Sequence, residues 1–247
     1  MTAVSIRDLR FSYPEKPELL SGISLEASAS EKTGIIGPNG SGKTTLFLLV
    51  AGVLKPHSGS ITLMEEPVKP GRFNPHFGMV FQNPDDQLFS VSVGDDLAFG
   101  LRNMGLGREE TEKRVWEMLE SLDMSCLAER PPHHLSGGEK RMISLAGVMV
   151  MRPDIIALDE PDASLDSRSR RRLIDYIRSS TETMFIASHD LEFVLETCSR
   201  VVILDGGEVR ADGPPAEVMS RSDLMEAHGL EKPHSLVPHA EPHHDRN

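Results

Sequence analysis

A glycine-rich loop at residues 37–44 constrains this chain more than any other feature of its sequence. The loop reads GPNGSGKT and fits the pattern GxxxxGKS/T, which binds phosphate when it joins a strand to a helix. Residues 33–36 before the loop are predicted to form a short buried strand, and residues 43–54 after it a helix. The loop therefore stands in the context that its motif requires. We expect an α/β domain with a nucleotide-phosphate site at the end of this strand.

The residue types in the loop suit this chemistry. Gly37, Gly40 and Gly42 have no Cβ, so the backbone can turn tightly and aim successive N–H groups at phosphate oxygens. Lys43 is expected to reach the β- and γ-phosphates, and the Thr44 hydroxyl to bind Mg²⁺. A plain glycine turn before a helix is the alternative, but all the required positions and both flanks agree with the motif. The residues assigned to the nucleotide here are Asn39, Gly40, Ser41, Gly42, Lys43, Thr44 and Thr45.

Composition narrows the class of protein. The net charge of −12, from 38 acidic and 26 basic residues, argues against a function built on contacts with nucleic-acid phosphates. The longest nearly unbroken apolar run, residues 142–151, is shorter than the roughly 18 residues that indicate a membrane span. Residues 1–5 lack the basic and apolar pattern of a secretory signal. Cys126 and Cys198 are isolated thiols, which suits a reducing cytoplasm.

Strand and helix patterns alternate along the chain, which predicts a mostly parallel sheet covered on both faces. The expected strands are residues 4–11, 23–27, 33–36, 77–81, 155–158, 184–187 and 201–204. Between Val93 and Met151 the strand signal disappears and apolar residues recur at helical spacing, so a helical insert is expected. From about Ser222 the pattern fades into a polar, mobile tail. The predicted division is a nucleotide-binding core at 1–92 and 152–222, a helical subdomain at 93–151 and a histidine-rich tail at 223–247.

Two carboxylates follow the predicted strand 155–158. Asp159 and Glu160 have the form of a Walker B motif, at the C-terminal edge of a strand expected beside the phosphate strand. Asp159 is expected to bind Mg²⁺ through its water shell. Glu160 is placed to polarise a water for attack on the γ-phosphate. Paired carboxylates are common in loops, so the assignment depends on their combination with Lys43 and Thr44.

A third motif, LSGGEK at residues 135–140, stands just ahead of a predicted helix. It resembles the signature motif of ATP-binding-cassette (ABC) ATPases. Ser136, Gly137 and Gly138 can offer a hydroxyl and backbone N–H groups to a phosphate at a helix N-terminus. The spacing of Ser136 and Glu139 is also that of a capping box, which starts a helix. Both interpretations can hold together. The family usually has Gln where Glu139 stands.

The remaining ABC elements follow in order and extend the resemblance over nearly the whole chain, up to about Gly229. Tyr13 matches the aromatic residue that stacks on adenine, with a core aromatic as the alternative. Gln82 matches the Q-loop glutamine that touches Mg²⁺ and the attacking water. His189 matches the switch histidine that senses the γ-phosphate. Residues 164–166 match the D-loop, although Asp162 and Ala163 before them depart from it. The resemblance implies a P-loop (RecA-like) α/β core with an antiparallel β subdomain and an inserted α-helical subdomain. It implies as catalytic residues Glu160, His189, Gln82 and Lys43, and as Mg²⁺ ligands Thr44, Gln82 and Asp159.

In this family the signature motif of one cassette completes the ATP site on the phosphate loop of another. One chain then carries two half-sites, and the resemblance implies a head-to-tail homodimer around two ATP molecules. A heterodimer with a related cassette stays open. Closure of such a dimer would move whatever is docked on the helical subdomain.

The segments FQNPDDQLF at 81–89 and RPPHHL at 130–135 resemble the ATPase subunit of energy-coupling-factor importers, in particular the cobalt/nickel type. This implies ATP-driven import of a transition-metal ion through integral membrane subunits, which bind the ion, with this chain peripheral at the cytoplasmic face of the membrane. Asp85, Asp86 and Gln87 are candidates for the contact with those subunits, or form a solvated turn. An importer of a vitamin and a soluble regulatory ATPase remain as alternatives. Too few residues separate Lys43 from Leu135 for the coiled coil of chromosome-maintenance ATPases.

Histidines and arginines outside these motifs have two interpretations each. Adjacent residues on a regular element do not face one metal, so His133 and His134 are expected to position the signature loop. The tail could chelate Ni²⁺ or Co²⁺ loosely, or be a solvated segment without function. The tail histidines are His228, His234, His239, His243 and His244. The arginines at 168 and 170–172 indicate a solvated helix face, or one near anionic lipid, that begins at an Asp166 N-cap.

Overall fold

The computed structural model describes residues 1–237 and contains two β-sheets in that part of the chain. The larger sheet has the strand order β10-β9-β3-β8-β7-β6, and its strands are parallel except for β10. Its strands are β3 (Lys32–Ile36), β6 (Phe77–Val80), β7 (Ile155–Asp159), β8 (Thr183–Ala187), β9 (Arg200–Asp205) and β10 (Glu208–Gly213). The predicted parallel α/β core is therefore confirmed. The expectation that the strand before Asp159 lies next to the phosphate strand was wrong, because β8 pairs with both and lies between β3 and β7.

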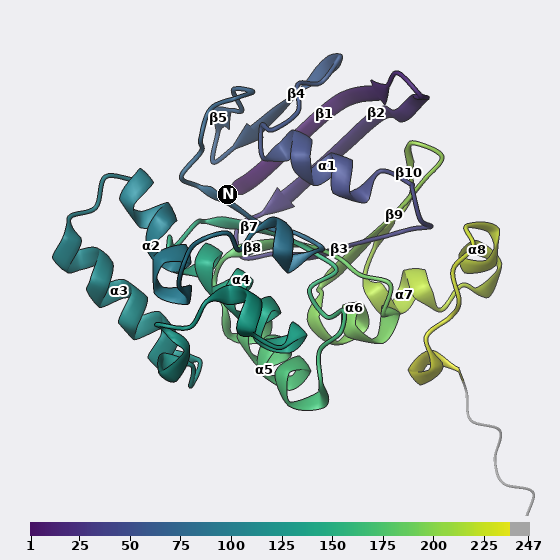
Figure 1. The fold of residues 1–247 in the computed structure, drawn as a ribbon. Helices are drawn as coiled ribbons and strands as arrows, with labels where there is room; N and C mark the ends of the chain where they lie inside the picture. Colours follow the sequence, from purple (N-terminus) through teal and green to yellow (C-terminus); the bar gives the residue numbers. More distant parts are fainter. Residues whose placement is uncertain (238–247) are drawn as a thin grey trace, which may run out of the picture.

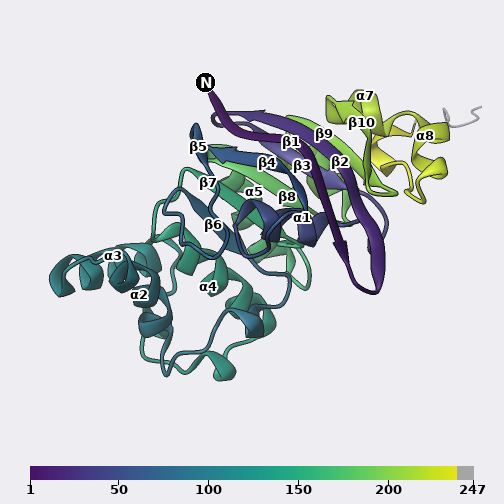
Figure 2. The ribbon, with the colours of Figure 1, turned by 90° about the horizontal axis from the view of Figure 1, so that it is seen from above.

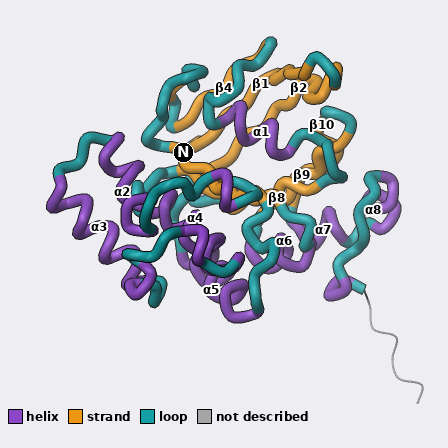
Figure 3. The backbone as a smooth tube through the Cα atoms, in the orientation of Figure 1, coloured by secondary structure: helices purple, strands orange, loops and turns teal. Residues whose placement is uncertain are grey.

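The smaller sheet is antiparallel, with the order β2-β1-β4-β5. Its strands are β1 (Thr2–Tyr13), β2 (Lys16–Ser28), β4 (Ser58–Leu63) and β5 (Glu66–Pro67). Helix α1 (Lys43–Val50) lies between this sheet and the parallel one, while α4, α5 and α6 cover the opposite face (Figure 1). Figure 3 shows the strands gathered on one side of the molecule and most helices on the other.

The two faces of the parallel sheet build two separate hydrophobic cores. In β7, Ile155 and Ala157 pack with α1 and the antiparallel sheet, whereas Ile156 and Leu158 pack with the helices on the other face. All four side chains are fully buried. Successive side chains of a strand point to opposite faces, so a sheet covered on both sides needs an apolar residue at every position. This explains the unbroken apolar runs in the sequence.

The region between β6 and β7 is helical, as predicted. It contains α2 (Val93–Asn103), α3 (Arg108–Ser121) and α4 (Gly137–Met149), with short 3₁₀ turns η1 (Pro84–Asp86), η2 (Ser125–Leu127) and η3 (Pro132–His134). Helices α2 and α3 project to one side of the molecule, far from the C-terminal helices (Figure 2). Helix α4 is the exception, because it packs against β6 and joins this region to the core.

Two helices of the core begin where their capping residues predict. Asp166 caps α5 (Ser167–Ser179) by accepting a hydrogen bond from the Ser169 N–H, which confirms the expected N-cap. Asp190 caps α6 (Leu191–Thr197) in the same way. The arginines of α5 are partly neutralised within the protein, since Arg170 pairs with Asp190 and Glu196.

Other expectations from the sequence were also wrong. Several expected boundaries differ from the structure, such as that of β2, which was expected at residues 23–27 and spans Lys16–Ser28. Helix α1 ends at Val50 rather than 54, because Gly52 adopts a positive φ of 73° that a helix cannot continue. Strands β4, β5 and β10 were missed because their apolar alternation is weak, and β5 and β10 lie at the edges of their sheets. The chain is also ordered beyond Ser222: α7 (Pro215–Met219), α8 (Ser222–Ala227) and η4 (His234–Leu236) follow β10.

The C-terminal segment is held by specific contacts. Met225 of α8 is fully buried in the core, and His228 Nδ1 lies 2.8 Å from Asp205 Oδ2. The Ser235 hydroxyl donates to Glu192 at 2.6 Å. These long-range contacts are not visible in the local pattern, so the prediction of a mobile tail fails over residues 222–237. His239, His243 and His244 lie outside the described residues.

Gly78 of β6 provides a test of the contact between β6 and α4. A Cβ at this position would lie 2.3 Å from Val148 Cγ1, which is too close. Gly78→Ala should therefore lower the free energy of unfolding by about 1–3 kcal/mol, measured by urea denaturation. Gly147→Ala in α4 is the matched control, because its Cβ would meet nothing closer than 4.0 Å. That variant should not be destabilised, since Ala is the better helix former. Equal losses in both would contradict the tight packing at Gly78.

Candidate functional site

The loop between β3 and α1 has the conformation that its glycines predict. Gly40 and Gly42 have φ angles of 74° and 106°, which favour glycine, and a Cβ on Gly37 would lie 2.0 Å from the Leu204 carbonyl oxygen. Helix α1 begins without a side-chain cap, so the N–H groups of its first turn remain available. The buried Ser41 Oγ has no hydrogen-bond partner among the described residues. A cradle of free donors at a helix N-terminus fits a phosphate.

Lys43 is folded back onto this loop. Its Nζ donates to the carbonyl oxygens of Gly37 at 2.8 Å and Pro38 at 3.1 Å, and the side chain is only 7% exposed. Burial lowers the pKa of Lys43, while the charges of Glu160 and Asp159 oppose this shift. The ammonium is therefore a buried cation held in place by backbone oxygens, next to the loop that would carry the phosphates.

A pocket of about 290 Å³ opens at this loop. It lies where the C-terminal ends of the parallel strands β3, β6, β7 and β8 meet at one edge of their sheet. Tyr13 and Lys16 border it from the hairpin of β1 and β2. The lining residues are Tyr13, Lys16, Leu19, Asn39, Gly40, Gly42, Lys43, Thr44, Thr45, Gln82, Asp159, Glu160 and His189. The structure thus brings together in one site the residues predicted from the phosphate loop, the Walker B motif, the Q-loop and the switch histidine. Ser41 borders a neighbouring hollow with Asn39 and Gly40.

Tyr13 is 37% exposed at the rim of this pocket, and its ring meets Phe11 edge to face with centroids 4.9 Å apart. It is therefore not a buried core aromatic. Lys16 was missed by sequence reasoning. The β1–β2 hairpin pairs Tyr13 with Lys16 and brings the Lys16 Nζ to 2.5 Å from the Gly40 carbonyl oxygen. Only the hairpin register could have indicated this contact.

Oxygen ligands suited to Mg²⁺ meet beside the loop. The Thr44 Oγ1 donates to Asp159 Oδ2 at 2.6 Å, which joins the first turn of α1 to the end of β7. Burial raises the pKa of Asp159, whereas the hydrogen bond from Thr44 and the charge of Lys43 lower it. A hydroxyl and a carboxylate are hard ligands that leave positions for water and phosphate oxygens, so these residues fit Mg²⁺. No group of three or more His, Cys, Asp or Glu residues in the described chain forms a metal cluster of its own.

Glu160 and His189 face each other at the ends of β7 and β8. The His189 N–H donates to Glu160 Oε2 at 3.1 Å, and His189 Nε2 lies 3.4 Å from Oε1. Burial raises the pKa of Glu160 to about 7, against the hydrogen bond from the His189 backbone. Burial also lowers the pKa of His189, which favours the neutral imidazole. A carboxylate whose pKa lies near neutrality can take up a proton from water at physiological pH.

The signature residues stand apart from this pocket. Ser136 caps α4 in the predicted capping box: it accepts from the Glu139 N–H at 3.3 Å, and its own N–H donates to Glu139 Oε2 at 2.8 Å. Ser136 and Gly137 are exposed, and Ser136, Gly137 and Gly138 are not among the pocket residues. One chain therefore does not bring the signature motif to its own phosphate loop.

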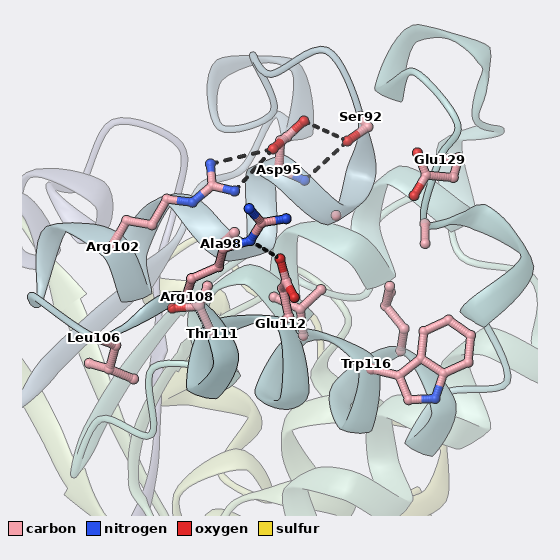
Figure 4. A pocket seen from close by; sticks show the side chains of 14 residues that line it. Ser92, Asp95, Ala98, Arg102, Leu106, Arg108, Thr111, Glu112, Trp116 and Glu129 are labelled. Carbon is pink, nitrogen blue, oxygen red and sulfur yellow. Dashed lines mark hydrogen bonds and ion pairs between the residues drawn. The ribbon is translucent and has the colours of Figure 1, made fainter.

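A larger cavity of about 690 Å³ lies between α2 and α3, in the helical region (Figure 4). Its charged groups neutralise one another: Arg102 bonds with Asp95, and Arg108 bonds with Glu112 at 2.7 Å. Trp116 forms one wall and is 54% exposed. No residue predicted to bind nucleotide borders this cavity, so it does not belong to the phosphate site.

The fold, the phosphate loop and the two carboxylates at the end of β7 define a P-loop ATPase of the ABC class. Residues 20–163 match the family model described as ABC transporter. An ABC transporter ATP-binding protein of Synechocystis is 49% identical over 95% of this chain and 82% of its own length. The energy-coupling factor transporter ATP-binding protein EcfA of Methanothermobacter thermautotrophicus is 41% identical over 93% of this chain and 76% of its own.

Among solved structures, CbiO1 of Clostridium perfringens aligns with a TM-score of 0.78 at 35% identity. The alignment covers 92% of this chain and 94% of CbiO1, which is described as part of the ABC transporter complex CbiONQ. The chain belongs to the ABC transporter ATP-binding family and is of the energy-coupling-factor type. It is an ATP-hydrolysing enzyme, and the resemblance inferred from its motifs is confirmed.

Glu160→Gln should stabilise the nucleotide-free, chelator-treated protein in a pH-dependent way. A carboxyl with a raised folded-state pKa favours folding at low pH, and this contribution is lost as the pH rises towards about 7. The variant should therefore gain about 2–3 kcal/mol over the parent at pH 8, but less than about 1 kcal/mol at pH 5, by urea denaturation.

The control is Glu139→Gln. Hydrogen bonds from the Ser136 backbone and hydroxyl lower the pKa of Glu139, so this variant should show no gain at pH 8. A gain for Glu160→Gln that is the same at both pH values would mean that the raised pKa of Glu160 does not cause it.

Proposed function

We propose that this chain is the ATP-binding and ATP-hydrolysing subunit of an energy-coupling-factor type transporter that imports a transition-metal ion, cobalt or nickel. The observation that carries the proposal is the separation of its two half-sites, with Lys43, Asp159 and Glu160 in one pocket and Ser136 outside it. A second cassette must then supply the missing signature. The membership of CbiO1 in the ABC transporter complex CbiONQ supports partner subunits. The choice of cargo rests on the resemblance of residues 81–89 and 130–135 to the cobalt/nickel type.

The proposed active form is a head-to-tail homodimer that encloses two ATP molecules. Ser136, Gly137 and Gly138 of one protomer would face the γ-phosphate held by the loop of the other. The first turn of α4 suits this role because Gly137 and Gly138 have no side chains to block the helix N-terminus, which the capping box of Ser136 and Glu139 holds in place. ATP that binds the closed dimer more tightly than the open one would drive closure.

Each pocket residue has a proposed role in hydrolysis. Tyr13 stacks on the adenine, residues 39–45 hold the phosphates, and Lys43 moves from its loop carbonyls to the β- and γ-phosphates. Thr44, Asp159 and Gln82 hold Mg²⁺, which when bound neutralises charge on the phosphate oxygens. Glu160 takes a proton from the attacking water, and His189 senses the γ-phosphate across the pocket.

Apolar side chains beside the Q-loop support a membrane partner. Phe89 is 66% exposed and Val91 81% exposed, and Phe89 meets Phe99 of α2 edge to face at 4.9 Å. Asp96 holds this turn by accepting from the N–H groups of Phe89 and Ser90. Exposed aromatic clusters mark protein interfaces. We place integral membrane subunits on this patch, with the chain peripheral at the cytoplasmic face of the cell membrane.

Two of the three residues that the sequence offered for this contact, Asp85 and Gln87, have partners within the chain. Asp85 pairs with Lys140 at 2.6 Å, and the Gln87 side-chain amide donates to the Ser144 carbonyl oxygen at 2.6 Å. Asp86 is exposed in η1. We therefore assign direct contact with the membrane subunits to Phe89, Val91 and Phe99. Residues 85–87 would support this contact by holding the turn next to α4.

No helix in residues 1–237 is long and apolar enough to cross a membrane. Transport would thus depend on partner chains, which would also bind the ion. The same ATPase could serve an importer of a vitamin or another small solute, or act as a soluble regulatory ATPase. Purification of the chain from membranes with its bound subunits discriminates between these functions, and recovery without any integral membrane protein would contradict import.

Glu160→Gln tests the assigned base. The variant should bind ATP and accumulate as a closed dimer, because it keeps the pocket but cannot accept the proton from water. Hydrolysis should fall by about 10²- to 10⁴-fold, measured as phosphate release, with the dimer followed by light scattering. Near-normal turnover would show that Glu160 is not the base.

Phe89→Asp tests the proposed docking patch. A charge at the centre of an apolar interface should weaken capture of the membrane subunits by at least roughly thirtyfold, while ATP hydrolysis by the isolated chain stays unchanged. Trp116→Asp is the matched control, an exposed aromatic on α3 that borders the other cavity. Equal capture by the Phe89 variant and the parent would exclude the patch.

A further inference from the structure

Arg141 is a buried cation that belongs to none of the motifs that form the ATP site. It lies in α4, five residues after Ser136, and is only 6% exposed. Its Nη1 donates to the carbonyl oxygen of Phe81 at 3.0 Å. Phe81 directly precedes Gln82, the proposed ligand of Mg²⁺ and water. The guanidinium therefore joins the helix that starts at the signature motif to the peptide that carries the Q-loop glutamine.

Further contacts join the same two segments. The Phe81 N–H donates to Gln87 Oε1 at 3.2 Å, and the Gln87 Nε2 donates to the Ser144 carbonyl oxygen on α4 at 2.6 Å. Lys140 Nζ pairs with Asp85 at 2.6 Å. Both backbone polar groups of Phe81 are thus bonded, the carbonyl oxygen to Arg141 and the N–H to Gln87. We call these contacts of Arg141, Gln87 and Lys140 the Q-loop clasp.

Burial of the Arg141 charge costs free energy, which argues that the side chain does more than fill space in the core. Its Nε has no hydrogen-bond partner among the described residues. Within residues 1–237, no carboxylate lies within 4.0 Å of the guanidinium, although Asp162, Asp159 and Glu160 attract it from further away. Burial lowers the pKa of Arg141 because it disfavours the charged guanidinium, while these carboxylates oppose the shift. An apolar side chain would fill this space at a lower free-energy cost. We therefore look for a function of the charge and of its hydrogen bond to Phe81.

We propose that Arg141 is a positioning residue for ATP hydrolysis, which through the Q-loop clasp holds Gln82 in register with the signature helix α4. Gln82 lines the pocket with Lys43 and Asp159, whereas Ser136 at the start of α4 is not among the lining residues. The clasp makes the Q-loop and the signature end of α4 move as one body. Closure of the second cassette on Ser136 would then carry Gln82 with it. The inference rests on the proposed role of Gln82.

The test is a double-mutant cycle in ATP hydrolysis by the full chain. Arg141→Met should lower kcat by about 10- to 100-fold with little change in KM for ATP, because the misplaced group acts on water and not on nucleotide binding. Gln82→Ala should give a similar loss. The double variant should be no slower than Gln82→Ala alone by more than about two- to threefold, since both changes remove the same function. Arg141→Lys should recover part of kcat, because it keeps a donor for the Phe81 carbonyl.

A matched control and a second variant make the test decisive. Arg102→Met removes an arginine of α2 that pairs with Asp95 away from the Q-loop, and it should leave kcat unchanged. Gln87→Leu breaks another contact of the clasp without uncovering a buried charge, and it should reproduce both the kcat loss and the non-additivity with Gln82→Ala. This variant decides the matter if Arg141→Met does not fold.

Several results would overturn the proposal. Losses that multiply in the double variants would show that the clasp acts independently of Gln82. A rise in KM with unchanged kcat would assign Arg141 to nucleotide binding. If Gln82→Ala hydrolyses ATP normally, the assignment of Gln82 fails and the proposal fails with it. Glu160→Gln and the capture of membrane subunits test the proposed function separately, so either can succeed when the clasp fails.

Discussion

Parallel pairing of β3, β8, β7 and β6 is the constraint on which the rest of the structure depends. Because these strands run in one direction, their C-terminal ends meet at one edge, where the phosphate loop, Asp159, Glu160, Gln82 and His189 come together. The alternating side chains of the same strands fill two cores, one with α1 and the antiparallel sheet and one with α4 to α6. A register shift of one residue in β7 would exchange these faces and remove both carboxylates from the pocket.

The site is built around buried charges of opposite sign. Lys43 and Arg141 are nearly inaccessible to water, as are Asp159 and Glu160. Burial disfavours every one of these charges, and the attraction between the two signs offsets part of the cost. Incoming nucleotide adds negative charge beside the cations, and closure removes water. Among the described residues, Arg141 Nε and Glu160 Oε1 have no hydrogen-bond partner, so some of these buried charges are left without local compensation.

Much of the fold and of the candidate site could be predicted from the sequence. Residues 155–158 and 184–187 are apolar at every position, as expected of strands buried on both faces, and both form inner strands of the parallel sheet. The capping box at Ser136 and the N-cap at Asp166 depend on spacing of three residues and were confirmed. The positions of Lys16 and Arg141 could not be predicted. Lys16 reaches the loop through a hairpin register, and Arg141 meets a carbonyl sixty positions earlier in the chain.

The sequence by itself determined the chemistry and the class of this protein: a phosphate loop, a pair of carboxylates and a signature motif, each readable because its residues are close together along the chain. Only the tertiary structure decided which of them share a pocket, that Ser136 stands outside it, and that residues 222–237 are packed against the core rather than mobile. The physical reason is that local spacing specifies turns, caps and strand faces, whereas burial and charge pairing depend on segments that meet only after the sheet has formed.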